Sequence, residues 1–202
     1  MLTLLCWLSL PASALRPAPD VRAEVESVLA GAVARAATED LAAAVSLAGR
    51  IESRVGPFGA VRYERALALY QAGELKRART AYDDVLALVP DHAGALYDRG
   101  ELALLAGDRD AARRDLEAAA KLRPDHWVVA YRLAQIACED GRYGDTETHL
   151  LDALHRGLDL GMLVSDPAWR PLMKVPDARR TIERMVVVYG SDALLKELES
   201  VP

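Results

Sequence analysis

The sequence predicts an all-α fold assembled from repeated pairs of antiparallel helices. Alanine, the residue with the highest helix propensity, occurs 36 times among the 202 residues, whereas aromatic residues make up only 5%. No stretch of the chain shows a convincing strand pattern. Small, apolar and turn-forming residues recur with a period of 34. A period of this length is typical of solenoids, in which each repeat contributes one supersecondary unit.

The charge balance argues against a general nucleic-acid-binding protein. Lys and Arg total 25 against 30 Asp and Glu, which gives a net charge of −5. Proteins that bind nucleic acids without sequence preference carry a basic excess that displaces counterions from the phosphates. The abundance of Ala, Arg and Leu is typical of a bacterial chain from a GC-rich genome.

Residues 1–14 have the features of a short secretory signal peptide. The segment reads MLTLLCWLSLPASA, lacks charged side chains and ends in a small-x-small pattern. We therefore expect cleavage after Ala14, an extended linker over residues 15–20 and a periplasmic or secreted protein. The apolar run is too short for an integral membrane span, which takes about 20 residues. The alternative is an apolar tail that packs on the first helix of a cytoplasmic protein.

Glycine and other small residues mark the turn and the helix contacts of each repeat. Gly73, Gly107 and Gly141 are spaced by 34, and each lies between two amphipathic stretches where a tight turn favours positive φ. Small side chains recur where a partner helix has to approach closely. These positions are Ala66, Gly100 and Ala134 in the first helices, and Ala78, Ala112 and Thr146 in the second. Each unit is therefore a helix–turn–helix of 34 residues.

Proline and aspartate mark the boundary between units. Pro90 and Pro124 are expected to end the second helix of a unit, because proline cannot continue a helix. Asp91 and Asp125 follow them directly and are the expected N-caps of the next helix.

This pattern resembles the tetratricopeptide repeat, whose consensus places small residues, a turn glycine and a closing proline at these offsets. The resemblance implies a right-handed superhelical solenoid with three clear repeats, at 59–92, 93–126 and 127–160. The third repeat departs from the consensus, since Thr146 replaces an alanine and Leu158 stands where proline is expected.

Helical segments are also predicted on both sides of the three repeats. Residues 21–58 contain two amphipathic stretches, 21–36 and 39–54, with Thr38 as the expected N-cap of the second. They form either a simple helical hairpin or a degenerate fourth repeat. Residues 161–202 are expected to form capping helices.

Three helix starts are predicted within this C-terminal segment. They are Asp166-Pro167, Pro176 and Ser191, and the helix that begins at Pro176 should run to about Tyr189. The segment resembles the sequences that often terminate bacterial tetratricopeptide arrays and shield the open edge of the solenoid.

No catalytic constellation is present, so we expect a non-enzymatic protein without a cofactor. The chain has no P-loop, no G-x-G-x-x-G after a strand and no G-x-S-x-G. The four histidines show no metal-ligand spacing, and we expect no metal site.

The resemblance implies that function resides on a concave surface lined mainly by the first helix of each repeat. The residues that it places there are Tyr63, Leu67, Tyr70, Tyr97, Glu101, Leu104, Tyr131, Gln135 and Glu139. We expect a protein partner that supplies a peptide or helix with apolar anchors and some positive charge. Some family members clamp a C-terminal carboxylate with basic residues, but among the matching positions here only Arg132 could serve, so that function is not expected.

The tyrosine column has two interpretations. Tyr63, Tyr97 and Tyr131 recur at one repeat position, and tyrosine is enriched at binding hot spots. The rings either contact a ligand or pack between adjacent repeats. The leading functional hypothesis is a scaffold or adaptor. The alternative is a structural accessory or cap subunit of an envelope complex, which associates through its convex face or through an apolar contact of Trp169, Met173 and Met185 in the C-terminal cap.

Overall fold

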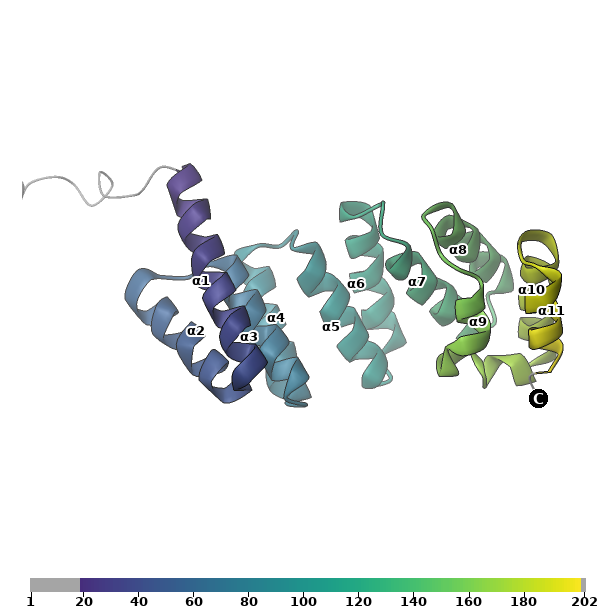
Figure 1. Cartoon of the computed structure of the whole chain (residues 1–202), viewed down its shortest axis with the longest axis horizontal. Coiled ribbons are helices and arrows are strands. Elements are labelled where there is room, and N and C mark those ends of the chain that lie inside the picture. Colours follow the sequence, from purple (N-terminus) through teal and green to yellow (C-terminus); the bar gives the residue numbers. More distant parts are fainter. Residues whose placement is uncertain (1–18, 201–202) are drawn as a thin grey trace, which may run out of the picture. The chain divides into compact units, whose positions relative to one another are not determined.

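A computed structural model describes residues 19–200, and all regular elements within this range are helices (Figure 1). The helices belong to two compact units, and the chain passes from the first to the second between Leu88 and Val89. The predicted signal peptide, 1–14, lies outside the described residues. Within the described range, no helix combines the length and the apolar character needed to cross a membrane.

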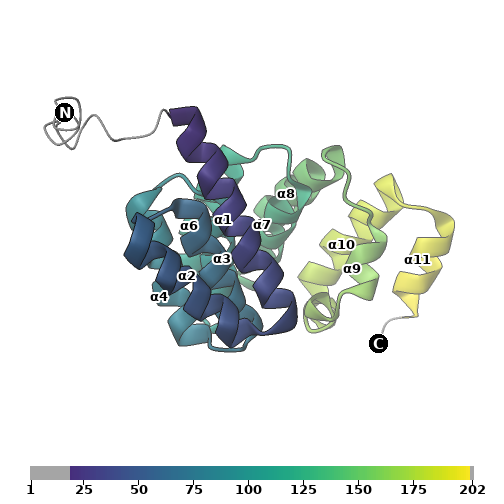
Figure 2. The same cartoon turned by 60° about the vertical axis from the view of Figure 1, so that its left-hand side comes forward.

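Unit 1 consists of two helix pairs. Its helices are α1 (Pro19–Glu39), α2 (Leu41–Val55), α3 (Gly59–Gln71) and α4 (Leu75–Leu88). α1 packs against both α2 and α3 (Figure 2). The interface is built from small and medium apolar side chains that are almost fully buried, among them Val33, Ala44, Ala48 and Val61.

Unit 2 contains two further helix pairs and a C-terminal cap. The pairs are α5 (Ala93–Leu105) with α6 (Arg109–Leu122), and α7 (Trp127–Glu139) with α8 (Tyr143–His155). The cap comprises α9 (Gly161–Ser165), the 3-10 turns η2 (Pro167–Trp169) and η3 (Leu172–Lys174), α10 (Pro176–Tyr189) and α11 (Asp192–Glu199). The core of the cap is centred on Trp169, which is fully buried.

The predicted turn glycines all adopt positive φ and build the same turn. The φ angles of Gly73, Gly107 and Gly141 are +75°, +78° and +72°. In each case the N–H of the third residue after the helix end donates to a carbonyl five residues earlier, as in the 2.9 Å bond from Asp108 to Ala103. This is the Schellman motif, which needs a left-handed residue and therefore selects glycine.

The small residues lie where the two helices of a pair come closest. Ala66, Ala78, Ala112 and Ala134 have no exposed surface. At Gly100 an added Cβ would lie 3.1 Å from Cγ of Leu116 on the facing helix, so even a methyl group would crowd the interface there.

The unusual residues of the third repeat fit without disrupting it. Thr146 is fully buried, and its hydroxyl donates to the carbonyl oxygen of Arg142 at 3.1 Å. α8 ends at His155 and is followed by Gly157 with φ of +101°. Glycine therefore ends the helix in place of the missing proline, and Leu158 is buried in the core.

The predicted N-caps at the repeat boundaries were wrong by one residue. The helix starts one position later than expected, because Asp91 and Asp125 belong to the preceding turn. The capping residues are His92 and His126, and Nδ1 of His92 accepts a hydrogen bond from Ala95 N–H at 3.1 Å.

Two other helix starts also differ from expectation. α1 continues to Glu39, so Thr38 lies inside it and Asp40 caps α2 by accepting from Ala42 N–H at 2.9 Å. After Asp166 only the short turn η2 forms, because Pro171 lacks the N–H that a longer helix needs. The predicted starts at Pro176 and Ser191 agree with α10 and α11.

Candidate functional site

The first helices of unit 2 present a connected set of polar side chains. Arg132 on α7 reaches Glu101 on α5, with Nη2 to Oε2 at 3.2 Å. Its Nη1 lies 4.0 Å from Oδ2 of Asp166 and donates to Oε1 of Gln135 at 3.0 Å. A single guanidinium therefore joins α5, α7 and the segment that follows α9.

The polar contacts continue along α7 to its C-terminal end. Nε2 of Gln135 donates to Oε1 of Glu139 at 3.3 Å, and Oε2 of Glu139 accepts from Nε of Arg109 on α6 at 2.9 Å. We call the set formed by Tyr97, Glu101, Leu104, Arg132, Gln135, Glu139 and Asp166 the α5–α7 face. Each of these side chains is half-buried, so it is held in place yet still meets solvent.

The electrostatics of this face are dominated by partial burial. Burial raises the pKa of Glu101, although the charge of Arg132 opposes the shift. Burial also raises the pKa of Tyr97, which hydrogen-bonds Arg132. For Arg132 burial lowers the pKa, but Glu101, Tyr97 and Asp166 together outweigh it and the net shift is upward. Oε1 of Glu101 is buried and has no hydrogen-bond partner among the residues that the structure describes.

The three tyrosines of the repeat column occupy three different environments. Tyr131 is only 2% exposed, and its ring lies between Trp127 and Trp169, at centroid distances of 6.0 and 5.8 Å. Its hydroxyl donates to Asp166 at 2.9 Å. The expectation that Tyr131 lines an open groove is therefore corrected, because aromatic rings from α7 and the cap enclose it.

The other two tyrosines remain partly accessible. Tyr97 is half-buried on the α5–α7 face. Tyr63 is half-buried in unit 1, where its ring lies 6.1 Å from that of Tyr82. Tyr70, near the end of α3, is half-buried as well. Cys138, by contrast, is buried on α7, and desolvation raises the pKa of its thiol to about 11, so it stays protonated and unreactive.

Unit 1 carries a pocket of about 190 Å³ between α1 and α3. Leu67, which the sequence placed on the binding surface, lines it. The full lining is Ala34, Ala37, Thr38, Glu64, Leu67, Ala68 and Gln71. Glu64 was missed by the sequence reasoning. It occupies the same repeat position as Asp98 and Arg132, and that column of charged residues on first helices was the available signal.

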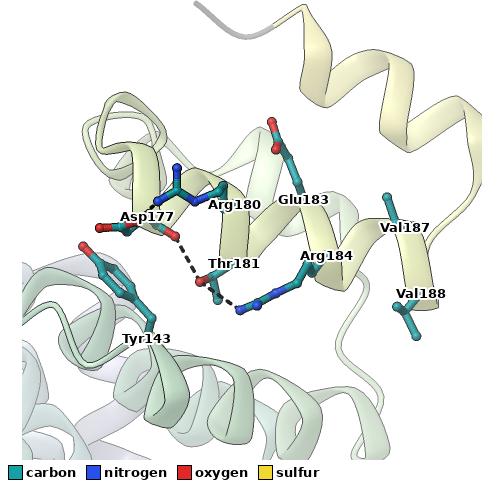
Figure 3. A pocket seen from close by; sticks show the side chains of 8 residues that line it. All are labelled: Tyr143, Asp177, Arg180, Thr181, Glu183, Arg184, Val187 and Val188. Carbon is teal, nitrogen blue, oxygen red and sulfur yellow. Dashed lines mark hydrogen bonds and ion pairs between the residues drawn. The ribbon is translucent and has the colours of Figure 1, made fainter.

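A second pocket, of about 470 Å³, lies between α8 and α10 in unit 2 (Figure 3). Arg180 pairs with Asp177, and Arg184 lies 3.5 Å from both the Thr181 hydroxyl and Glu147. The remaining lining includes Tyr143, Glu183, Val187 and Val188.

The apolar contact expected at the cap also needs correction. Trp169, Met173 and Met185 are buried in the core of the cap, with exposed fractions of 0%, 2% and 1%. The most exposed large apolar residues described there are instead Val187, Val188 and Tyr189 at the end of α10, which are 53–65% exposed. Among residues 19–200, no group of three or more His, Cys, Asp or Glu side chains is placed to hold a metal ion.

Comparison with known proteins identifies one repeat family. A family model described as "Tetratricopeptide repeat" matches residues 63–108 and 97–157. The human protein "Tetratricopeptide repeat protein 7B" is 37% identical over 82 residues, which are 41% of this chain and 10% of that protein. The chain thus spans about a tenth of the length of this relative.

Solved structures share the fold at low sequence identity. MamA from Desulfovibrio magneticus RS-1, residues 41 to the end, has a TM-score of 0.65 at 20% identity, covering 88% of this chain and 95% of that chain. A tetratricopeptide repeat protein from Parabacteroides merdae has a TM-score of 0.58 at 20% identity, covering 91% and 72%. YrrB, described as "a TPR protein with an unusual peptide-binding site", has a TM-score of 0.62 at 10% identity, covering 81% and 86%. The predicted all-α fold of stacked helix pairs is confirmed.

Proposed function

Because this chain belongs to the tetratricopeptide repeat family, we propose that it is a non-enzymatic scaffold that binds a peptide or helix of a protein partner. The proposed contact surface is formed by the first helices of the repeats. The observation that carries the proposal is the α5–α7 face, where polar side chains are linked to one another yet remain half-exposed.

The arrangement of this face suits binding. Side chains that already hold one another in place lose little conformational freedom when a ligand arrives, which favours affinity. Tyr97 and Leu104 supply apolar area, and Gln135 supplies amide groups that can hydrogen-bond a peptide backbone. A peptide-binding site is also described for YrrB, which shares the fold.

The charges on the face indicate the chemistry of the partner. Glu101, Glu139 and Asp166 supply three carboxylates, whereas Arg132 is the one cation among the residues that define the face. A partner with apolar anchors and a basic residue therefore complements it better than an acidic one.

A peptide-display selection on the purified full chain tests this function. We expect selected peptides to share an apolar residue next to Lys or Arg. Tyr97→Ala should weaken their binding at least tenfold, in line with a hot-spot loss of about 2 kcal/mol. Tyr189→Ala removes an equally large but exposed ring on α10 and should leave binding unchanged. Unaltered affinity in the Tyr97 variant, with its helix content preserved, would exclude this face.

The cap supports a second candidate function, an accessory subunit of an envelope complex. Val187, Val188 and Tyr189 are exposed at the end of α10, and the two valines line the pocket in Figure 3. If this surface carries the interaction, Tyr189→Ala abolishes partner capture while Tyr97→Ala does not. The same two variants therefore separate the two candidates.

Export is the third part of the proposal, and it rests on the sequence of residues 1–14. Intact-mass measurement of the protein purified from its native host should give a chain that begins at Leu15. A chain that retains residues 1–14 would contradict export by cleavage.

A further inference from the structure

The pocket between α1 and α3 is large enough for a side chain. Its volume of about 190 Å³ is several times the share of one water molecule, about 30 Å³. The walls are mostly small and apolar, with Ala34 and Ala37 from α1 facing Leu67 and Ala68 from α3. Such walls suit the aliphatic stem of a long side chain.

Glu64 is the one charged residue in the lining of this pocket. In the described part of the chain its carboxylate takes part in neither a hydrogen bond nor an ion pair. The neighbouring arginines of α3 are committed elsewhere. Nε of Arg62 donates to Oε1 of Glu52 at 2.7 Å, and Nη1 of Arg65 lies 3.8 Å from Oε2 of the same glutamate.

Burial of this carboxylate has an energetic consequence. Desolvation raises the pKa of Glu64, with no compensating charge. A carboxylate that loses hydration on folding without gaining a partner destabilises the folded state. A cation bound next to Glu64 would recover part of this desolvation free energy. Binding of a cationic ligand is therefore favoured in the pocket.

The surroundings of the pocket also favour a cation. Ala37 and Thr38 belong to the last turn of α1, and Ala68 and Gln71 to the last turn of α3. The carbonyl end of a helix carries partial negative charge. An adjoining pocket of about 690 Å³ shares Ala37 and Thr38, and its lining adds the carboxylates of Glu39, Asp40 and Glu74 against one guanidinium, that of Arg77, which is paired with Glu74.

We propose that this pocket binds the side chain of an arginine or lysine in the partner peptide, with its stem against Leu67 and Ala68 and its charged head on Glu64. The assignment rests on the proposed peptide-binding function and deepens it, because it names one residue type that the partner has to contain.

The test uses amino-acid probes rather than the partner itself. N-acetyl-arginine amide is titrated into the full chain carrying 13C-labelled Ala and Leu methyl groups, and N-acetyl-citrulline amide serves as the neutral isostere. We expect the arginine probe to shift the methyl signals of Ala34, Leu67 and Ala68, and to bind about threefold to fivefold more tightly than citrulline, the range of a partly exposed ion pair.

Two variants complete the experiment. Glu64→Gln should reduce arginine binding to the citrulline level. Glu24→Gln removes an exposed carboxylate of α1 that lines neither pocket and should change nothing. Equal binding of the two probes, no methyl shift with either, or unaltered discrimination in Glu64→Gln would overturn the proposal.

The outcome is independent of the test of the proposed function. If selected peptides bind through Tyr97 while arginine and citrulline bind alike, the pocket assignment fails and the scaffold function stands. If the probes are discriminated through Glu64 but the display selection yields no peptide, the preference of the pocket for a cationic side chain stands, whereas the scaffold function and the peptide as the source of that side chain fail.

Discussion

At the scale of single residues, Tyr131 links the third repeat to the cap. Its ring contacts Trp169 and its hydroxyl donates to Asp166, while Asp166 also caps η2 by accepting from Ala168 N–H at 2.9 Å. The carboxylate of Asp166 therefore accepts hydrogen bonds from donors in two different elements, α7 and η2.

We expect Tyr131→Phe to destabilise the chain by about 2 kcal/mol, because a hydrogen bond to a charged and half-buried carboxylate is lost. Urea unfolding followed by circular dichroism measures the change. Tyr70→Phe is the matched control, since its hydroxyl makes no hydrogen bond within residues 19–200, and it should stay within about 0.5 kcal/mol. Equal effects of the two changes would show that the contact with Asp166 contributes nothing.

The raised pKa of Glu64, again a property of a single residue, predicts that the stability of the folded chain depends on pH. Its pKa is raised in the folded chain, so the folded state binds more protons than the unfolded state near that pKa. The stability associated with the protonated form is present below the ordinary pKa of 4.5 and is lost as the pH rises through the folded-state pKa.

We therefore expect Glu64→Gln to gain stability relative to the wild type between about pH 4 and about pH 7. Urea unfolding of both proteins at the two pH values isolates the effect, because all other groups titrate equally. A relative loss of stability on going to the higher pH would reveal a cation that already stabilises the carboxylate.

At the scale of elements, the turn between the helices of a repeat depends on one backbone conformation. Gly107 has φ of +78°, and an added Cβ would meet no atom within 4 Å. Substitution there is therefore strained by the backbone alone, not by packing.

We expect Gly107→Ala to destabilise unit 2 by about 1 kcal/mol, the cost of a left-handed conformation for an L-residue. Gly49→Ala is the opposite case. Gly49 lies inside α2 with open space around it, so alanine should stabilise that helix by roughly 0.5–1 kcal/mol. Denaturation midpoints measure both changes, and the same sign at both sites would contradict this account.

At the scale of the whole molecule, each unit has its own core. The apolar cluster of unit 2 is continuous from α7 through the cap, with Leu150, Trp169 and Ile182 fully buried in it. That of unit 1 joins α1, α2 and α3. Solenoids draw their stability from each repeat and its nearest neighbours.

We accordingly expect residues 89–202, expressed alone, to fold into the helices seen in the full chain and to unfold cooperatively. Thermal unfolding followed by circular dichroism checks this. A non-cooperative transition, with helix content well below that of the same residues in the full chain, would show that unit 2 depends on residues 1–88.

Much of the architecture could be predicted because it depends on local chemistry. The turn glycines, the small residues at helix contacts and the starts of α10 and α11 follow from φ preference, side-chain volume and capping. The N-caps at the repeat boundaries could not be placed to the residue, since aspartate and histidine adjoin at each boundary and both can accept a hydrogen bond.

The candidate site was predictable only as a surface. Periodicity alone identified which positions belong to first helices, and Glu101, Gln135 and Glu139 do lie together on the α5–α7 face. Periodicity treats Tyr63, Tyr97 and Tyr131 as equivalent, yet their exposures differ because each has different neighbours. The charged repeat column could have placed Glu64 on a first-helix surface, but the sequence could not show that its carboxylate has no cationic partner within residues 19–200.

The sequence by itself determined the helix pairs, their turns and the family, because these depend on residues close together in the chain or repeated along it. Only the tertiary structure decided which side chains remain available. Trp169 in the cap covers Tyr131. Glu52 pairs with Arg62 and Arg65, and within residues 19–200 no cation pairs with Glu64. Burial and charge pairing depend on groups that are distant in the chain. For that reason they decide which side chains can contact a partner, and local helix or turn propensity does not.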